Sequence, residues 1–380
     1  MTGFLSRLHK GLRFFLRLHG IVFFGGYPFP EREKDGYFLR IRAIDDIFSD
    51  RYRIYIDDYS LPDRQALFEK VAHQTYVIRS GGRLKQSILS KILMLLCILK
   101  CRTIYFHSIY QINRSRKLMF YTGLKKFLDV HGVVPEEFGY NDDDQNKALY
   151  NQIEHHAVTR ANILIVVTER MRQHLQDKYP GEIQGEFILL PILSELNEAH
   201  IEKPLKKGRR IVIYAGGLQK WQQVPKMIDA MLANQDHFEF RFYCPNPHEL
   251  QKMLPPQLKT SKALIIGSKS NEEILSEYQE SHFGFILRED NIVNQVACPT
   301  KLIEYLALGV IPIVESAEIG DFNSLGMRSI PIDDFLHGEI PDLAEINEMR
   351  VANRKVYQSL KKAYEDGKNQ LRNRIPLKQC

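Results

Sequence analysis

The chain has 380 residues, of which 44% are apolar and 26% are charged. This balance excludes a disordered chain, and the length favours two domains of ordinary size over one. Lys and Arg outnumber Asp and Glu by 52 to 46, a mild excess that suits an anionic substrate or surface. The basic residues are dispersed and no nucleic-acid-binding motif occurs, so we expect no nucleic-acid partner.

The five cysteines are scattered and form no C-x-x-C pair, which indicates free thiols in a reducing compartment. The first 20 residues lack the uninterrupted apolar run and the cleavage site of a secretory signal. No stretch reaches the roughly 18 apolar residues of a spanning helix. We therefore expect a cytoplasmic protein, at most peripheral at the inner face of the cell membrane.

Residues 1–18 combine apolar and basic side chains at helical spacing. The apolar members are Phe4, Leu5, Leu8, Leu12, Phe15 and Leu16, and the basic ones are Arg7, Lys10, Arg13 and Arg17. This pattern fits an amphipathic helix that lies on anionic lipid. It fits equally well a helix that packs on the first domain with its charges in solvent.

The most apolar segment is residues 84–102, where a run over 92–99 lies between lysines. One interpretation is a buried helix of the first domain. The other is a helix that faces a membrane and carries a cationic rim. The usual location of such residues favours burial.

Strand-like runs alternate with helical runs in two successive series, which predicts two parallel sheets wrapped by helices. The first series of strands is expected at residues 21–24, 53–56, 77–78, 103–106 and 163–167, and the second at 210–214, 238–243, 263–266, 283–287 and 310–314. We expect an N-terminal domain over 19–193, a linker over 194–209 and a C-terminal domain over 210–350. We expect each of the two domains to be doubly wound, with a cleft between them.

A loop, a helix and a strand follow one another from Pro299 onward. Pro299 enters the helix with Thr300 as a candidate cap, and Gly309 suits a left-handed end. The amides of Thr300 and Lys301 are expected to face the cleft at the positive helix end, where a diphosphate can bind. Glu304 shares their face, and its carboxylate can accept two hydrogen bonds from ribose hydroxyls.

The pattern P-x-K-x-x-E-Y-x-A-x-G-x-x-P-x-V in this segment resembles the nucleotide-sugar site of group 1 glycosyltransferases, family 4 of the retaining GT-B enzymes. Residues 210–231 resemble the first strand, glycine loop and helix of that family's donor domain. Further segments resemble its acceptor domain, namely residues 27–44, the D-x-H-G-x-x-P-E-E run at 129–137, and Glu154 with 161–168. The resemblance is to members of bacterial polysaccharide or glycoconjugate biosynthesis.

The resemblance implies a GT-B fold and the transfer of a hexosyl group, with retention, from a UDP- or GDP-sugar to a hydroxyl of a lipid-linked saccharide. It implies no metal, and a basic tail over 351–380 that crosses back to the first domain. It also implies a role for each matching residue. Glu304 would hold the ribose, Thr300 and Lys301 would donate backbone N–H groups to the diphosphate, Gly216 and Gly217 would let the backbone approach the phosphates, and His131 would lie beside the transferred sugar.

The sequence departs from the family at the phosphate clamp. The family pairs two glutamates eight positions apart, and Val296 stands at the earlier position. The positions of its usual Arg and Lys are taken by Gly217 and Gln222. Lys220 and Arg288 are the substitutes we expect to act in catalysis. The same departures support an alternative, a catalytically weak subunit that binds and supports a partner glycosyltransferase.

Two acidic runs offer a different interpretation, the metal site of the other glycosyltransferase fold. Asp57 and Asp58 follow a predicted strand, and residues 142–144 are all aspartate. Acidic loops are usually solvated, so we expect no metal at either place.

Overall fold

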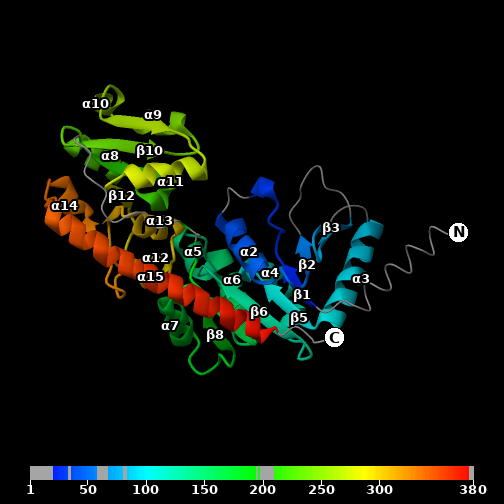
Figure 1. Cartoon of the computed structure of the whole chain (residues 1–380). Coiled ribbons are helices and arrows are strands. Elements are labelled where there is room, and N and C mark those ends of the chain that lie inside the picture. Colours follow the sequence, from blue (N-terminus) through cyan, green and yellow to red (C-terminus); the bar gives the residue numbers. More distant parts are fainter. Residues whose placement is uncertain are drawn as a thin grey trace. The chain divides into compact units, whose positions relative to one another are not determined.

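The computed structural model describes residues 20–32, 36–57, 67–79, 84–193, 196 and 209–375 (Figure 1). The chain forms two compact units. Unit 1 comprises Met1–Val167, Arg172–Leu190 and Glu365–Cys380, and unit 2 comprises Thr168–Met171 and Pro191–Tyr364. The amphipathic segment expected at 1–18 and nearly all of the expected linker lie outside the described residues.

Unit 1 alternates strands and helices, as the hydrophobic runs predicted. Its strands are β1 (Gly20–Phe24), β2 (Tyr52–Asp57), β3 (Phe68–Ala72), β4 (Thr75–Arg79), β5 (Thr103–Phe106), β6 (Lys125–Val130), β7 (Ile163–Val166) and β8 (Glu186–Leu189). Its helices are η1 (Pro30–Arg32), α2 (Gly36–Ile47), α3 (Leu84–Cys101), α4 (Ile109–Met119), α5 (Val134–Tyr140), α6 (Asp144–Val158) and most of α7 (Glu169–Lys178), whose first three residues belong to unit 2.

The described strands of unit 1 form one sheet in the order β3-β4-β2-β1-β5-β6-β7-β8. All neighbours pair in parallel except β3 and β4, which form an antiparallel hairpin. Buried apolar runs such as β7 fill the strands because helices cover both faces of a parallel sheet. The strand order reverses between β1 and β5, and ligands bind at the carboxyl ends of strands at such a switch point.

Unit 2 repeats the alternation. Its strands are β9 (Arg210–Ala215), β10 (Phe238–Tyr243), β11 (Leu264–Gly267), β12 (Phe283–Ile286), β13 (Ile311–Val314) and β14 (Ile330–Pro331). Its helices are η2 (Lys220–Gln222), α8 (Val224–Asn234), α9 (Pro247–Met253), α10 (Pro256–Lys259), α11 (Asn271–Glu280), α12 (Ile292–Gln295), α13 (Thr300–Leu308) and α14 (Ile332–Leu336).

The described strands of unit 2 form a parallel sheet in the order β11-β10-β9-β12-β13-β14. The core is rich in aromatic rings on three successive strands, including Phe240 of β10, Tyr214 of β9 and Phe285 of β12. The strand order reverses between β9 and β12. Segments that follow these two strands therefore meet at the carboxyl edge of the sheet.

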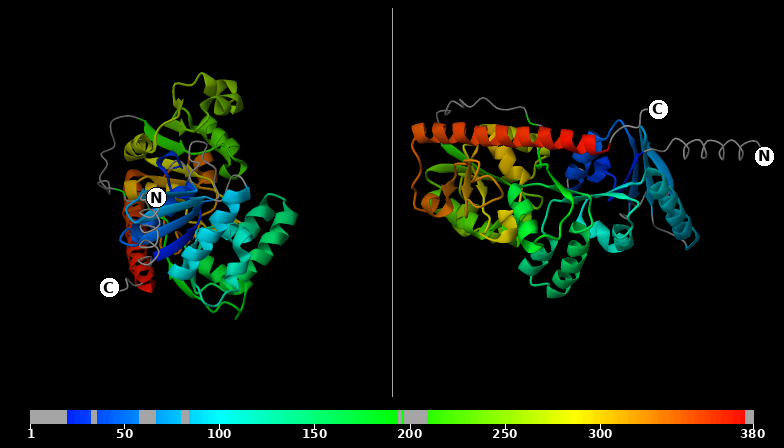
Figure 2. Two further views of the ribbon diagram at one scale, coloured as in Figure 1. Left: turned by 90° about the vertical axis from the view of Figure 1, so that its right-hand side faces the viewer. Right: turned by 90° about the horizontal axis from the view of Figure 1, so that it is seen from below.

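Helix α15 (Leu343–Arg374) is a continuous helix that begins in unit 2 and ends in unit 1 (Figure 2). Its last turn is held in unit 1 by two pairs of side chains. Arg372 donates to Asp50 at 2.8 Å, and Arg374 bonds Glu186. The Arg51 guanidinium also donates to the carbonyl of Arg372.

The structure corrects two sequence expectations. Residues 84–102 do not form a buried helix, because α3 leaves six of its large aliphatic side chains exposed. Thr300 does not cap α13: Pro299 is the N-cap residue and makes no side-chain cap hydrogen bond, so Thr300 is already helical. The left-handed helix end at Gly309 is confirmed by its φ of 70°.

None of the helices in the described part of the chain is long and apolar enough to cross a bilayer.

Candidate functional site

Residues from three segments of unit 2 gather at the carboxyl edge of its sheet. Gly216 and Gly217 follow β9, Arg288 follows β12, and Lys301 lies in the first turn of α13. The Lys301 Nζ atom lies 4.0 Å from the centre of the Tyr214 ring at the end of β9. This cation–π contact brings the helix start to the glycine loop.

The glycine loop has no room for side chains. A Cβ atom on Gly216 would lie 2.6 Å from Lys301 Nζ and 2.8 Å from the Tyr214 hydroxyl oxygen. The Tyr214 hydroxyl donates a hydrogen bond to the Gly217 carbonyl at 2.6 Å, which fixes the path of the loop. Glycine is thus required here by close approach.

Helix α13 is positioned by Tyr305, whose ring is fully buried against β12. Gly284 provides the space, since a Cβ atom there would lie 2.5 Å from the Tyr305 ring. The Tyr305 hydroxyl lies 3.3 Å from the Phe285 carbonyl and 3.4 Å from the Ile213 carbonyl. These contacts hold the helix at strands β9 and β12, so its first turn lies beside the glycine loop.

The amino end of α13 presents amide donors. The amides of Leu302 and Ile303 both donate to the Pro299 carbonyl. The amides of Thr300 and Lys301 lie in the first turn, where the helix itself offers no carbonyl acceptor, so they can bind an anion. The helix dipole adds to their attraction for negative charge.

Lys301 and Glu304 lie three residues apart in this helix and interact electrostatically. Burial raises the pKa of Glu304 to about 7, and the Lys301 charge opposes that shift. Burial, together with the positive charge of Arg288, lowers the pKa of Lys301 to about 7. Two groups with pKa values near neutrality, next to helix amides, are typical of a ligand site.

The structure brings together six of the sequence-predicted residues and leaves two elsewhere. The six are Gly216, Gly217, Arg288, Thr300, Lys301 and Glu304. Lys220 lies in η2, exposed to solvent, and among the described residues we find no contact of its ammonium group with Lys301 or Glu304. His131 belongs to unit 1.

His131 lies at the carboxyl edge of the unit 1 sheet, in a cavity of about 130 Å³ next to the switch point. The walls come from the segments that follow β5 and β6 and from α2 and α5. They are lined by Tyr37, Ser108, Ile109, Tyr110, Asp129, Val130, His131, Gly132, Val134 and Glu137. The motif at 129–137 contributes Asp129, His131, Gly132 and Glu137 to this lining, and His131 is the one that was predicted as a site residue.

The floor of this cavity is a buried ion pair. The Arg40 guanidinium donates two hydrogen bonds to Asp129, both of 3.1 Å, and the Tyr105 hydroxyl donates a third of 3.2 Å. Burial alone would raise the pKa of Asp129, but the charges of Arg40 and His131 hold it well below its usual range. The His131 Nδ1 atom lies 3.8 Å from this carboxylate.

The sequence analysis missed several members of this cavity. Tyr37 and Ser108 line it, and His107 is fully buried behind it, where burial lowers the pKa of the imidazole to about 3. Gly25 adjoins His107, since a Cβ atom on Gly25 would lie 3.0 Å from its ring. The available signal was position: Gly25 and His107 directly follow β1 and β5, the two strands that flank the switch point.

One residue in each of the acidic runs that suggested a metal site has a structural partner, and Asp58 lies outside the described residues. Asp57 forms an ion pair of 2.9 Å with Arg32, and Asp143 caps α6 by accepting from the Asn146 amide. In the described ranges of the chain, no group of three or more His, Cys, Asp and Glu side chains is arranged to hold a metal ion.

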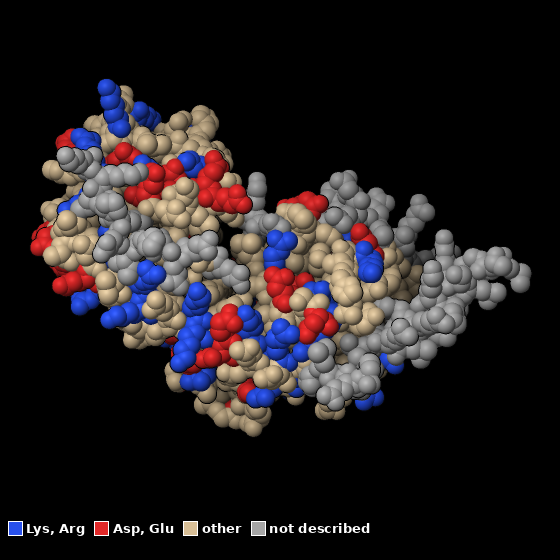
Figure 3. All heavy atoms as spheres, in the orientation of Figure 1, with Lys and Arg blue, Asp and Glu red and all other residues tan. Residues whose placement is uncertain are grey.

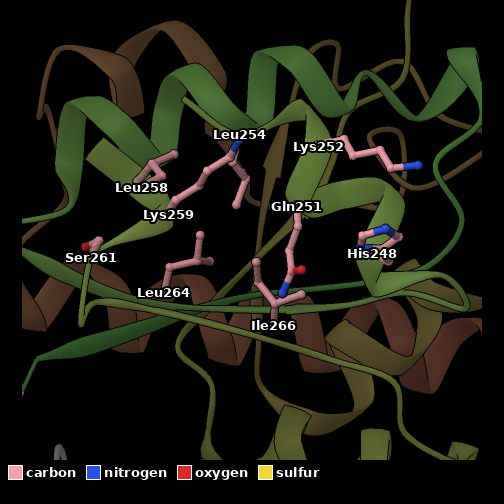
Figure 4. Close-up of a pocket in the computed structure, with 9 residues that line it drawn as sticks. All are labelled: His248, Gln251, Lys252, Leu254, Leu258, Lys259, Ser261, Leu264 and Ile266. Atoms are coloured by element: carbon pink, nitrogen blue, oxygen red, sulfur yellow. The ribbon is translucent and has the colours of Figure 1, made fainter. Parts of the chain in front are cut away.

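A cavity of about 600 Å³ in unit 2 lies away from this edge, between α9, α10 and β11 (Figure 4). None of the residues proposed for the nucleotide sugar lines it. Its walls are His248, Gln251, Lys252, Leu254, Leu258, Lys259, Ser261, Leu264 and Ile266. On the face drawn in Figure 3, basic and acidic residues are interspersed on both units without a broad basic area of the kind that binds nucleic acid.

Two doubly wound units in one chain, each with polar residues at its switch point, define the GT-B fold. Sucrose-phosphate synthase from Thermosynechococcus elongatus has a similar structure, with a TM-score of 0.67 at 12% identity over 93% of this chain and 97% of that one. An E. coli structure bound with UDP-2-fluoro glucose has a TM-score of 0.64 at 11% identity, over 94% of this chain and 98% of that one. The α,α-trehalose-phosphate synthase (UDP-forming) from Burkholderia vietnamiensis has a TM-score of 0.60 at 11% identity, over 94% of this chain and 99% of that one.

These similarities confirm the expected α/β fold class with two Rossmann-like domains. No family model and no curated protein matches the sequence.

Proposed function

We propose that the protein is a retaining glycosyltransferase that moves a sugar from a UDP- or GDP-sugar to a hydroxyl of a lipid-linked saccharide. The observation that carries the proposal is the cluster of Lys301, Glu304 and Arg288 with the first amides of α13, at the switch point of unit 2. A nucleoside diphosphate needs hydroxyl acceptors for its ribose and cationic or amide donors for its phosphates, and this cluster offers both.

Each residue of the cluster has a part in the proposed reaction. The Glu304 carboxylate accepts the ribose hydroxyls, and the amides of Thr300 and Lys301 bind the diphosphate. When the bond between the sugar and the diphosphate breaks, negative charge develops on the departing oxygen. The side chains of Lys301 and Arg288 stabilise that charge, which is the largest contribution available to catalysis without a metal ion.

The fold supports a sugar nucleotide as the donor. One similar structure holds UDP-2-fluoro glucose, and another is that of a UDP-forming synthase. The cavity around His131 in unit 1 is the candidate site for the acceptor and the transferred sugar, because its imidazole, Tyr37 and Ser108 can hydrogen-bond to hydroxyl groups.

One observation favours the alternative of a supporting subunit. Val296, at the position of the family's first glutamate, is 1% exposed, and its carbonyl accepts a hydrogen bond from the Thr168 hydroxyl. A buried valine cannot bind a sugar, so one donor contact of the family is absent. A purified chain that binds the nucleotide sugar but transfers nothing until a second protein is added would favour this function.

Thermal unfolding in the presence of UDP, GDP and their sugars tests the donor site. A ligand that binds only the folded state stabilises it by about 2.7 kcal/mol at 100 times its Kd. We expect one of the two nucleotides to raise the Tm. We expect Glu304→Gln to lower the affinity for that nucleotide by about 10- to 100-fold, which corresponds to the loss of one or two hydrogen bonds to a charged acceptor.

Glu345→Gln is the matched control, because Glu345 is an exposed carboxylate at the start of α15 in the same unit. It should leave nucleotide affinity unchanged. Unchanged affinity in Glu304→Gln, or no stabilisation by either nucleotide, would contradict the proposed donor site.

A further inference from the structure

Helix α3 carries an exposed apolar surface that no described element covers. Six large aliphatic side chains on it are about half exposed, an unusual number for one helix. They are Ile88 (54%), Leu89 (47%), Ile92 (50%), Leu95 (52%), Leu96 (46%) and Leu99 (49%). We call this set the α3 stripe. The helix lies along the outside of unit 1 (Figures 1 and 2).

The α3 stripe occupies one side of the helix. At about 100° per residue, its six positions fall within an arc of about 120°. The opposite side packs against β1, β4 and β5 through Ser90, Cys97 and Ile98, which are at most 2% exposed. The helix is therefore held in the fold by its other face, and the stripe is not needed for the core.

The charges on α3 have a single sign. The helix contains three lysines and no acidic residue. Lys91 and Lys100 fall on either side of the stripe at helical spacing, and Lys91 is exposed. An apolar band bordered on both sides by ammonium groups is complementary to a surface that is apolar inside and anionic at its rim.

The start of β1 lies beside the carboxyl end of α3. The Gly20 amide donates to the Cys101 thiol at the carboxyl end of α3. In the sequence, residues 1–19 contain four Lys and Arg residues and no acidic residue. Two segments of one chain that are both apolar and basic can act together on one anionic surface.

A second copy of the chain is a weaker candidate for the covering partner. Spacings of four, three and four residues along the stripe would suit helix pairing. However, α3 has no acidic residue to pair with Lys91 or Lys100 of another copy. Six side chains also fall short of the roughly 20 to 30 residues that each partner contributes to a standard interface.

We propose that the α3 stripe inserts into the surface of a bilayer that contains anionic phospholipids, with Lys91 and Lys100 at the level of the headgroups. The helix lies in the interface plane and does not span the bilayer. This surface goes beyond sugar transfer and does not depend on it, but it would place unit 1 where a lipid-linked acceptor is found.

Flotation of the full chain with vesicles tests the proposal. One set of vesicles contains phosphatidylglycerol and phosphatidylcholine, and the other phosphatidylcholine alone. We expect binding to the anionic vesicles only, weakened by salt. Ile92→Gln/Leu95→Gln/Leu99→Gln should reduce it at least 10-fold. Ile265→Gln/Leu325→Gln/Val351→Gln, which changes three aliphatic residues of unit 2 with 41–44% exposure, should not.

Three outcomes would overturn the proposal. They are a chain that does not float with anionic vesicles, a stripe variant that floats as well as the unchanged chain, and a stripe variant whose only change is the loss of a dimer in light scattering. Circular dichroism verifies that the variant folds. Its stabilisation by nucleotide should be unchanged, which separates failure of this proposal from failure of the donor site.

Discussion

At the scale of single residues, the most informative feature is that Lys301 and Glu304 both have a pKa near 7. Burial disfavours the charged form of each side chain, so it lowers the pKa of Lys301 and raises the pKa of Glu304. A diphosphate needs the protonated ammonium group, and ribose hydroxyls need the ionised carboxylate. Ligand binding must therefore adjust both protonation states.

The sign of this adjustment predicts a bell-shaped pH profile for nucleotide affinity. Below pH 7, Glu304 is protonated in the free protein and must release its proton on binding, so affinity falls as the pH falls. Above pH 7, Lys301 is neutral and must take up a proton, so affinity falls as the pH rises. Each limb should approach tenfold per pH unit.

Titration calorimetry in buffers of different ionisation enthalpy measures the protons directly. Proton release at pH 6 should change to uptake at pH 8, with little net exchange near pH 7. Lys301→Met should bind more weakly and lose the uptake at pH 8 while it keeps the release at pH 6. The same proton counts in this variant and the unchanged chain would show that Lys301 does not contact the phosphates.

At the scale of elements, the strand, glycine loop and helix around the donor site separate stability from binding. Gly309 ends α13 with a φ of 70°, and a Cβ atom there would meet nothing within 4 Å. Gly216 does not have a positive φ, but a Cβ atom there would clash with Lys301 and Tyr214. Backbone conformation therefore requires glycine at position 309, and close approach of neighbouring atoms requires it at position 216.

We expect opposite effects from alanine at these two positions. Gly309→Ala should cost about 1 kcal/mol of stability, the strain of a left-handed residue with a side chain, and leave nucleotide affinity unchanged. Gly216→Ala should displace the Lys301 ammonium group and lower nucleotide affinity at least tenfold. Its loss of stability should be smaller than that of Gly309→Ala. Urea unfolding and calorimetry on the two variants measure both quantities. Equal losses of affinity would contradict this division.

Most strands were predictable because buried parallel strands are continuous apolar runs, as at β7 and β13. The elements that escaped prediction lack that signal. Strand β6 starts with Lys125 and Lys126, whose ammonium groups reach the carbonyls of Arg374 and Met119. The hairpin strand β3 has an exposed phenylalanine at its start. For α3, composition could not reveal which face of the helix meets the sheet.

The two parts of the candidate site were predictable to different extents. In unit 2, one contiguous segment from Pro299 to Gly309 carries the helix start and the acid, so a motif could find them. In unit 1, the cavity assembles Tyr37, Ser108 and Asp129 from three segments that only strand order brings together. Without the order β1-β5-β6, no spacing in the sequence indicates that they are neighbours.

At the scale of the whole molecule, α15 is the helix that the two units share. Its residues from Glu365 onward belong to unit 1, where Gly367 is buried against β8. A Cβ atom on Gly367 would lie 2.1 Å from the Leu189 carbonyl oxygen, a contact that backbone cannot relieve by a rotamer change. The ion pairs of Arg372 and Arg374 are exposed, and exposed pairs contribute little. The close approach at Gly367 should therefore matter more than these pairs for holding the helix end.

Gly367→Ala tests this argument because two effects of the change oppose each other. Helix propensity alone would stabilise the variant by about 1 kcal/mol. The clash with the Leu189 carbonyl must instead push the helix away from β8, which we expect to cost about 1 to 3 kcal/mol. Hydrogen exchange should become at least tenfold faster in β8 and stay unchanged in β13 of unit 2, and stabilisation by nucleotide should persist. Gln370→Ala, at an exposed position of the same helix, should alter neither rate. A Gly367→Ala variant that is as stable as the unchanged chain would mean that the end of α15 does not pack on β8.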